Sequence, residues 1–149
     1  KPDARTTYVD FRRFYLPDSD PDFPRFSFDA MDKLYWGGTV LYLCIQLAAY
    51  LGCNPIYLIG VDLSYKIPND IQQSGAKLTS TSDDPNHFHP AYFGAGKRWH
   101  VPAPERMGRC FHRAWQILGQ RGIQLVNATD GGNLNSIPRA DFTSLFQKS

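Results

Sequence analysis

The chain has 149 residues, of which 42% are hydrophobic and 20% charged, and its formal net charge is +2. One domain of this size can bury roughly 68–70% of the surface that its unfolded chain exposes. The composition excludes a disordered or low-complexity protein, and so small a net charge gives no support to a nucleic-acid-binding surface.

Cysteine use and hydropathy set expectations for the location of the protein. Three cysteines, Cys44, Cys53 and Cys110, form neither a metal-ligand spacing nor a disulfide framework, which favours a reducing, cytoplasmic setting. The longest apolar stretch, residues 40–51, is shorter than the about 20 residues of a membrane span, so we expect none. Because the chain begins at Lys1 rather than Met, we expect its fold to lack an N-terminal portion.

In the first part of the chain, the pattern predicts a strand, a loop and an αβ unit. Residues 6–11 alternate loosely, as in a strand, and the rest of residues 1–33 reads as an irregular acidic loop rich in Pro and Asp. Within residues 34–65, the apolar residues 40–51 predict a buried helix, and residues 56–61 predict a buried strand of a parallel sheet.

The second part of the chain opens on a long polar segment. Residues 66–100 are too long for a simple connection, which is typical of a functional loop or lid. Within residues 101–149 we expect a helix over residues 105–120, a strand over residues 123–127 and a C-terminal turn. The order β, α, β, α, β predicts a single α/β domain over residues 1–149, with a mostly parallel, doubly wound sheet and helices on both faces.

A carboxylate follows the first buried strand. Ligands of open α/β sheets bind beyond the carboxyl ends of the strands, so Asp62 could bond a ribose hydroxyl, hold a divalent cation or orient an acceptor hydroxyl. A capping or turn role is the alternative. Ser64 and Tyr65 could donate to a phosphate or a sugar, and a glycine-led helix start could present free amides to the same crevice. The candidate nucleotide-binding residues are therefore Gly37, Gly38, Thr39, Gly60, Asp62 and Ser64.

Two histidines stand in the long polar segment. His87 and His89 are two residues apart, so in an extended chain both imidazoles point to one side, which suits a general base or a metal site. A zinc site would need a third and a fourth ligand at a defined spacing, so a general acid or base is favoured and no metal ligands are assigned. A structurally bonded pair is the alternative. The adjacent Asn86 is a candidate substrate contact.

Two further groups of polar residues could contact a ligand. Lys97 and Arg98 lie beside two glycines and suit a diphosphate, although their spacing matches no Walker loop or dinucleotide fingerprint. His100 follows them as a candidate substrate contact. Asn127 and Thr129 end the last expected strand, where they could read a base or sugar edge or simply build a turn.

Four segments in order carry a family resemblance: GGTV, LGCNPIYLIGVDLSY, NHFHPAYFGAGKRWH and NATDGGNLNSIPRADF. Across residues 34–146 the chain resembles the bacterial and archaeal 6-hydroxymethylpterin diphosphokinase-like family, formerly domain of unknown function 115. That family looks related to the motility-associated factor glycosyltransferases and to the family 42 sialyltransferases. The resemblance implies a Rossmann-like domain that binds a nucleotide-activated donor.

The resemblance also implies roles for individual residues. The helix start at Gly38 and Thr39 and the strand end at Gly60 and Asp62 would line the nucleotide pocket. The general base would be His87 or His89, with His100 as a weaker candidate, and Tyr65 would bond the leaving phosphate. The sialyltransferase tyrosine stands two residues past the aspartate, where this chain has Ser64.

Three functions follow as alternatives. The first is a nucleotide-dependent transferase, namely a sialyltransferase-like glycosyltransferase that uses a CMP-sugar to modify a surface glycan or glycoprotein. The second is diphosphoryl transfer from ATP to a pterin alcohol, with Mg²⁺ held by Asp62 and by Asp83 or Asp84. The third is a non-catalytic module that binds a nucleotide or a partner chain.

Overall fold

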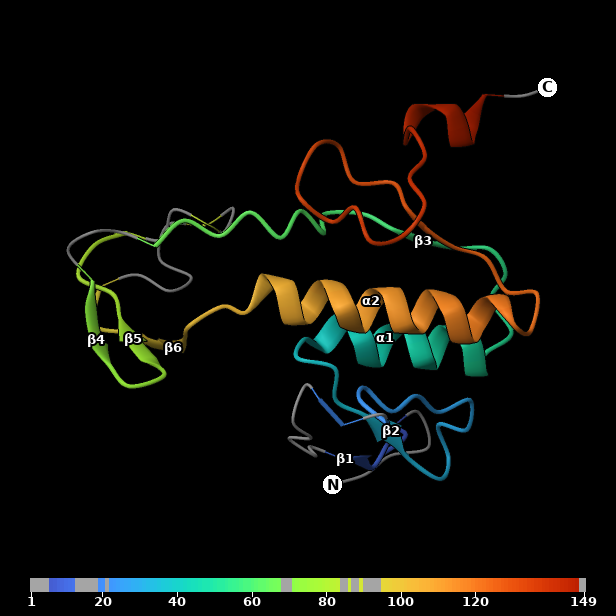
Figure 1. Ribbon diagram of the computed structural model, residues 1–149, viewed down its shortest axis with the longest axis horizontal. Helices are drawn as coiled ribbons and strands as arrows, with labels where there is room; N and C mark the ends of the chain where they lie inside the picture. Colours follow the sequence, from blue (N-terminus) through green and yellow to red (C-terminus); the bar gives the residue numbers. More distant parts are fainter. Residues whose placement is uncertain are drawn as a thin grey trace. The chain divides into compact units, whose positions relative to one another are not determined.

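The computed structural model describes residues 6–12, 19–20, 22–67, 71–83, 86, 89 and 95–147. The chain divides into two units, the first made of residues 1–62 and 105–149 and the second of residues 63–104. Short parallel and antiparallel sheets combine with two α-helices in the described part of the chain (Figure 1). The expected mixed α/β class is confirmed. Neither of these helices is long and apolar enough to cross a membrane.

The first helix of the first unit, α1 (Val40–Tyr50), lies where the sequence predicts it. Thr39 is its N-cap, and the Thr39 side chain accepts a hydrogen bond of 3.3 Å from the backbone N–H of Leu41. After its C-terminal end, Gly52 adopts a φ of 78°, a left-handed conformation that glycine adopts without strain. Both ends of the helix are therefore encoded locally.

The second helix, α2 (Pro104–Gly119), also confirms its sequence prediction. It begins on a proline, which suits the first turn because the missing N–H has no partner there. Its buried side chains recur at helical spacing and are Cys110, Phe111, Ala114 and Leu118. Both helices belong to the first unit, and in Figure 1 they lie between β3 and the β1–β2 pair.

Two parallel strand pairs complete the first unit. Strand β3 (Ile56–Leu58) pairs with β7 (Leu125–Asn127), and β1 (Phe11–Arg12) pairs with β2 (Leu34–Tyr35). The sequence prediction of a strand over residues 6–11 is wrong for residues 6–10, which form no strand. Nearly all of residues 6–12 are exposed, so tertiary packing does not support their loose alternation.

One face of the β3–β7 pair is buried and the other is open. Ile56 and Leu58 are 8% and 4% exposed, whereas Tyr57 and Ile59, which alternate with them, are 42% and 61% exposed. The expected arrangement of helices on both faces of the sheet is therefore not confirmed in the described part of the chain.

A buried tyrosine joins α1 to α2 and to the loop before β2. Tyr42 is fully buried, and its hydroxyl donates a 3.1 Å hydrogen bond to the backbone carbonyl of Arg25. Burial raises the pKa of Tyr42, and the neighbouring Cys110 of α2 adds to the effect. The Tyr42 ring also covers Gly37, where a Cβ atom would lie 2.4 Å from the ring, so this position requires glycine.

Gln46 is the buried polar residue that ties α1 to the preceding chain. Its Oε1 accepts from the backbone N–H groups of Ser27 and Tyr35 at 3.0 and 3.1 Å. Its Nε2 donates to the carbonyls of Tyr35 and Tyr42 at 2.8 and 3.0 Å. Gln46 is fully buried, and all four bonding positions of its amide are used, so it stabilises the fold without an unsatisfied group.

We predict that Gln46→Leu lowers the free energy of unfolding by roughly 2–4 kcal/mol, because the backbone N–H and C=O groups that bond to the Gln46 amide lose their hydrogen-bond partner. Urea unfolding followed by circular dichroism measures the loss. The matched control is Gln116→Leu, the same change at an exposed position of α2. Equal effects at the two positions would contradict the role assigned to the amide of Gln46.

The second unit contains a sheet that the sequence reading missed. Strands β4 (Gln72–Ser74), β5 (Lys77–Thr79) and β6 (Arg98–His100) form an antiparallel sheet in the order β4-β5-β6. The sequence predicts a long loop over residues 66–100, and this is wrong for these nine residues. Three-residue strands are too short to give a readable alternation, and only Leu78 among their side chains is fully buried.

Candidate functional site

The carboxyl ends of β3 and β7 lie at one edge of the sheet because the two strands are parallel. The backbone N–H of Ala128 donates to the carbonyl of Leu58 at 2.8 Å. One step further, the N–H of Val61 donates to the side-chain Oγ1 of Thr129 at 2.9 Å. The hydroxyl of Thr129 thus extends the pairing beyond the strands, and the Gly60–Asp62 segment is fixed beside the end of β7.

Asn127 holds the turn that follows β7. It is fully buried, its Oδ1 accepts from the N–H of Thr129 at 3.0 Å, and its Nδ2 donates to the carbonyl of Leu134 at 2.9 Å. Through these hydrogen bonds Asn127 and Thr129 build the turn, which is one of the two roles that the sequence left open for them. A substrate contact by either side chain stays a prediction.

Asp62 is positioned by a close approach of the backbone. Gly132 has a φ of 79°, and a Cβ atom there would lie 2.6 Å from the Cα of Asp62. The N–H of Asn133 donates to the carbonyl of Asp62 at 2.5 Å. Only glycine permits this contact, so the turn after β7 fixes the backbone of Asp62 while leaving the residue exposed.

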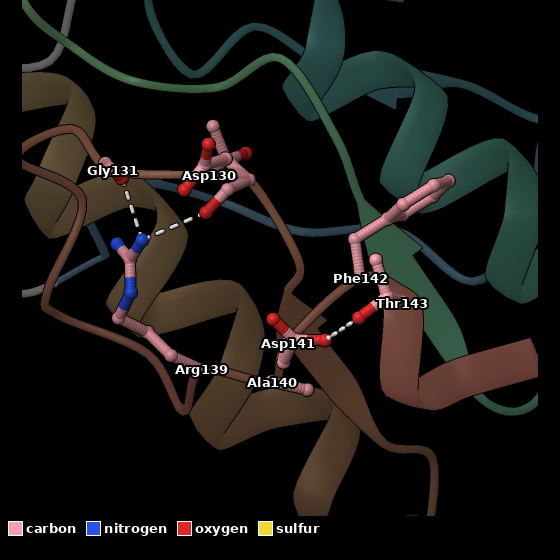
Figure 2. Close-up of a pocket in the computed structure, with 8 residues that line it drawn as sticks. Asp130, Gly131, Arg139, Ala140, Asp141, Phe142 and Thr143 are labelled. Atoms are coloured by element: carbon pink, nitrogen blue, oxygen red, sulfur yellow. Dashed lines mark hydrogen bonds between the residues drawn. The ribbon is translucent and has the colours of Figure 1, made fainter. Parts of the chain in front are cut away.

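A pocket of about 540 Å³ lies beyond the end of β7. Its wall consists of Thr129, Asp130, Gly131, Arg139, Ala140, Asp141, Phe142 and Thr143. In Figure 2, the side chain of Arg139 points toward the segment of Asp130 and Gly131. The volume falls within the roughly 300–1,000 Å³ of small-molecule sites.

Arg139 shapes one side of the pocket. Its Nη2 donates to the carbonyls of Thr129 and Gly131 at 2.8 and 2.5 Å, and its Nη1 donates to the carbonyl of Leu134 at 3.2 Å. The backbone of Arg139 also forms a parallel bridge with Asn127. The three hydrogen bonds of the guanidinium therefore stabilise the turn after β7. Because carbonyl groups carry no net charge, the guanidinium still contributes a positive charge to the pocket.

Asp141 lies across the pocket at the start of η1 (Thr143–Phe146). The hydroxyl of Thr143 donates to it (Figure 2), and the N–H of Ser144 donates to it at 2.8 Å. These hydrogen bonds lower the pKa of Asp141, with the Thr143 hydroxyl making the largest contribution. Asp141 is thus ionised at neutral pH. Sequence reasoning missed Asp141 and Thr143, although an Asp two residues before a Thr and three before a Ser is a turn signal.

The residues at the start of α1, which the sequence predicts to contact a nucleotide, make contacts within the chain. Thr39 accepts from Leu41 through its side chain and from Tyr42 through its carbonyl, the latter at 3.1 Å. Gly38 adopts a φ of 85°, and a Cβ there would lie 3.6 Å from the side chain of Met107. These contacts account for Gly37, Gly38 and Thr39 without a ligand, so their nucleotide role stays a prediction.

The other predicted residues fall in the second unit or outside the described residues. The side chain of Asn86 forms two hydrogen bonds with the backbone of Lys66: its Oδ1 accepts from the N–H at 2.6 Å, and its Nδ2 donates to the carbonyl at 2.8 Å. The predicted site residues that are exposed in this unit are Ser64, Tyr65, His89, Lys97, Arg98 and His100. The predictions for His87 and Asp84 lie outside the described residues. Gly60, Asp62, Asn127 and Thr129 are the predicted residues that the first unit brings together.

Among the described residues, no group of three or more His, Cys, Asp or Glu side chains is arranged to hold a metal ion. Asp62 belongs to the first unit and Asp83 to the second, and a Mg²⁺ role for either stays a prediction.

The chain matches a family model described as 6-hydroxymethylpterin diphosphokinase MptE-like over residues 1–68. The match confirms the family resemblance drawn from the sequence for the part that it covers, which includes α1, β3 and Asp62. Neither the curated proteins nor the solved structures compared with this chain gave a match.

We predict that Gly132→Ala destabilises the fold by about 1–3 kcal/mol more than Gly131→Ala. Both residues have positive φ, so both variants carry a similar backbone cost of about 1–2 kcal/mol. Only the Gly132 variant also drives a Cβ into the backbone of Asp62, because a Cβ at Gly131 has no atom within 4 Å. Urea unfolding measures the difference. Equal losses would show that the turn and the Asp62 segment do not pack as described.

Proposed function

We propose that this chain is a nucleotide-dependent transferase domain that binds its donor at the carboxyl edge of β3 and β7. The observation that carries the proposal is the pairing of Val61 with Thr129, which fixes the two strand ends beside each other. Ligands of parallel α/β sheets bind at such edges, and a pocket of suitable volume adjoins this one. A Rossmann-like arrangement of the whole domain is part of the proposal.

The pocket suits the sugar part of a nucleotide. Asp130 is exposed on its wall and carries an acceptor-only carboxylate, which pairs well with the hydroxyls of a ribose. Arg139 adds a positive charge on the same side of the pocket, where it offsets part of the negative charge of Asp130 and Asp141. Asp62, held at the end of β3, contributes a second carboxylate to this edge.

The leading reaction in this proposal is glycosyl transfer from a CMP-sugar to a glycan or glycoprotein. The sequence assigns the general base for the acceptor hydroxyl to His87 or His89, and it assigns stabilisation of the departing nucleotide phosphate to Tyr65, Lys97 or Arg98. The glycosidic bond forms as the bond between sugar and phosphate breaks, so no redox step is required. The sialyltransferase relationship in the sequence supports this choice of donor.

The second candidate is diphosphoryl transfer from ATP to a pterin alcohol. The family match over residues 1–68 favours it, because that family is described by this activity. Against it stands the donor set, since the described residues assemble no group of three metal ligands. In this alternative Mg²⁺ would be held mainly by the phosphates of ATP, as is usual for magnesium–nucleotide complexes.

A thermal-shift screen separates these candidates because a ligand of the native state stabilises it. We predict that saturating CMP raises the Tm by about 2–12 °C, the shift that roughly 1–3 kcal/mol of binding linkage gives a chain of this size. UDP, GDP and ATP, each with and without Mg²⁺, are the comparison set. A shift with ATP and Mg²⁺ alone supports the diphosphokinase candidate, and no shift with any nucleotide contradicts the proposal.

Two variants connect this binding to the strand-end site. Asp130→Asn and Asp62→Asn should each weaken CMP binding about tenfold, the loss expected for one charge-assisted hydrogen bond. The matched control is Asp32→Asn, which changes an exposed carboxylate that pairs with Lys33. Retained affinity in both site variants would place the nucleotide elsewhere.

A further inference from the structure

The register of the second unit's sheet brings cationic side chains from two strands together. In the β5–β6 pair, Lys77 is opposite His100 and Thr79 is opposite Arg98. Side chains of directly paired residues lie on the same face of a sheet, and residues two apart in one strand share that face. Lys77, Arg98 and His100 therefore lie on one face, which we term the cationic face.

The opposite side of the sheet fixes this orientation. Leu78 is fully buried, and it is paired with Trp99, whose indole Nε1 donates to Ser80 Oγ at 3.0 Å. A one-residue slip of register would expose Leu78 and break this arrangement. The buried side of the sheet thus commits the alternate residues, Lys77, Arg98 and His100, to the exposed side.

The cationic face has no internal counter-charge in the part of the chain that the structure describes. Lys77, Arg98 and His100 are all exposed, and the ion pairs among described residues involve other side chains: Arg12, Arg25 and Lys33. Lys77 directly faces His100, so the imidazole lies on the same face as the charged groups of Lys77 and Arg98. An anion bound at this face supplies the missing counter-charge.

We propose that the cationic face binds a phosphate group carrying two or more negative charges, such as a diphosphate. The guanidinium of Arg98 offers a planar fork of donors that matches phosphate oxygens, and Lys77 adds a mobile ammonium. Thr79, opposite Arg98, adds a hydroxyl donor to the same face. Arg98 is also a candidate for the departing phosphate in the proposed function, but binding of diphosphate to the cationic face needs neither the pocket of the first unit nor a transfer reaction.

The face differs from the phosphate site that the sequence suggests. That reading pairs Lys97 with Arg98 because they are adjacent in the chain, whereas adjacent residues in a strand point to opposite sides. The cross-strand register instead pairs Arg98 with Thr79 and brings in Lys77, which lies 21 positions earlier in the chain. Lys77 therefore becomes the residue whose removal tests the site.

The test is a titration of the full chain with inorganic diphosphate at about 0.15 M ionic strength, where the Debye length is about 8 Å. Binding is measured by calorimetry and by backbone amide chemical shifts. We expect saturable binding, with the largest shifts at residues 77–79 and 98–100. Lys77→Gln and Arg98→Gln should each weaken binding about three- to tenfold, and the double variant should weaken it further. Circular dichroism checks that each variant keeps its fold.

The control is Lys66→Gln, which removes an exposed lysine elsewhere in the same unit. It should leave the affinity within about twofold, since one remote surface charge is largely screened. An equal loss in this control, equal affinity for acetate, or no saturable binding would each overturn the proposal. Asp130→Asn should leave diphosphate binding unchanged, so a failed nucleotide site and a failed cationic face give different results.

Discussion

The parallel pairing of β3 with β7 is the constraint on which the first unit depends. It joins segments far apart in the chain, and the bond from Val61 to Thr129 spans 68 positions. Bringing such distant segments together costs loop-closure entropy, which the buried residues Ile56, Leu58 and Leu125 offset by removing apolar surface from water. The same pairing places both strand ends at one edge, so the candidate site follows directly from the fold.

Polar side chains in this unit mainly hold neighbouring segments of the chain together through hydrogen bonds. Gln46 bonds α1 to the chain before it, Asn127 bonds the turn after β7, and Arg139 bonds three carbonyls of that turn. Each buried amide has partners, as low local polarity requires. At the carboxyl edge, Asp62 and Asp130 are both exposed to solvent.

The sequence predicts the helices well and the short strands poorly. For α1 and α2, the signals are local: a Thr N-cap, prolines in the first turn and glycines after the ends. The strands of the second unit are three residues each, and their pairing depends on contacts between β5 and β6 across the intervening chain. The position of Asp62 at the end of a strand could be predicted from the sequence. The place of Asp141 and Thr143 in the pocket wall could not, because it depends on how the last turn folds.

A nucleotide bound between the two strand ends must contact both of them. Backbone amide chemical shifts of the full chain, followed during a titration with CMP, report on both ends at once. We expect the largest changes at two separated stretches, residues 60–62 and residues 128–131, and we expect them to follow the same binding curve. Changes confined to one stretch, or spread over residues elsewhere with both stretches unaffected, would contradict this expectation.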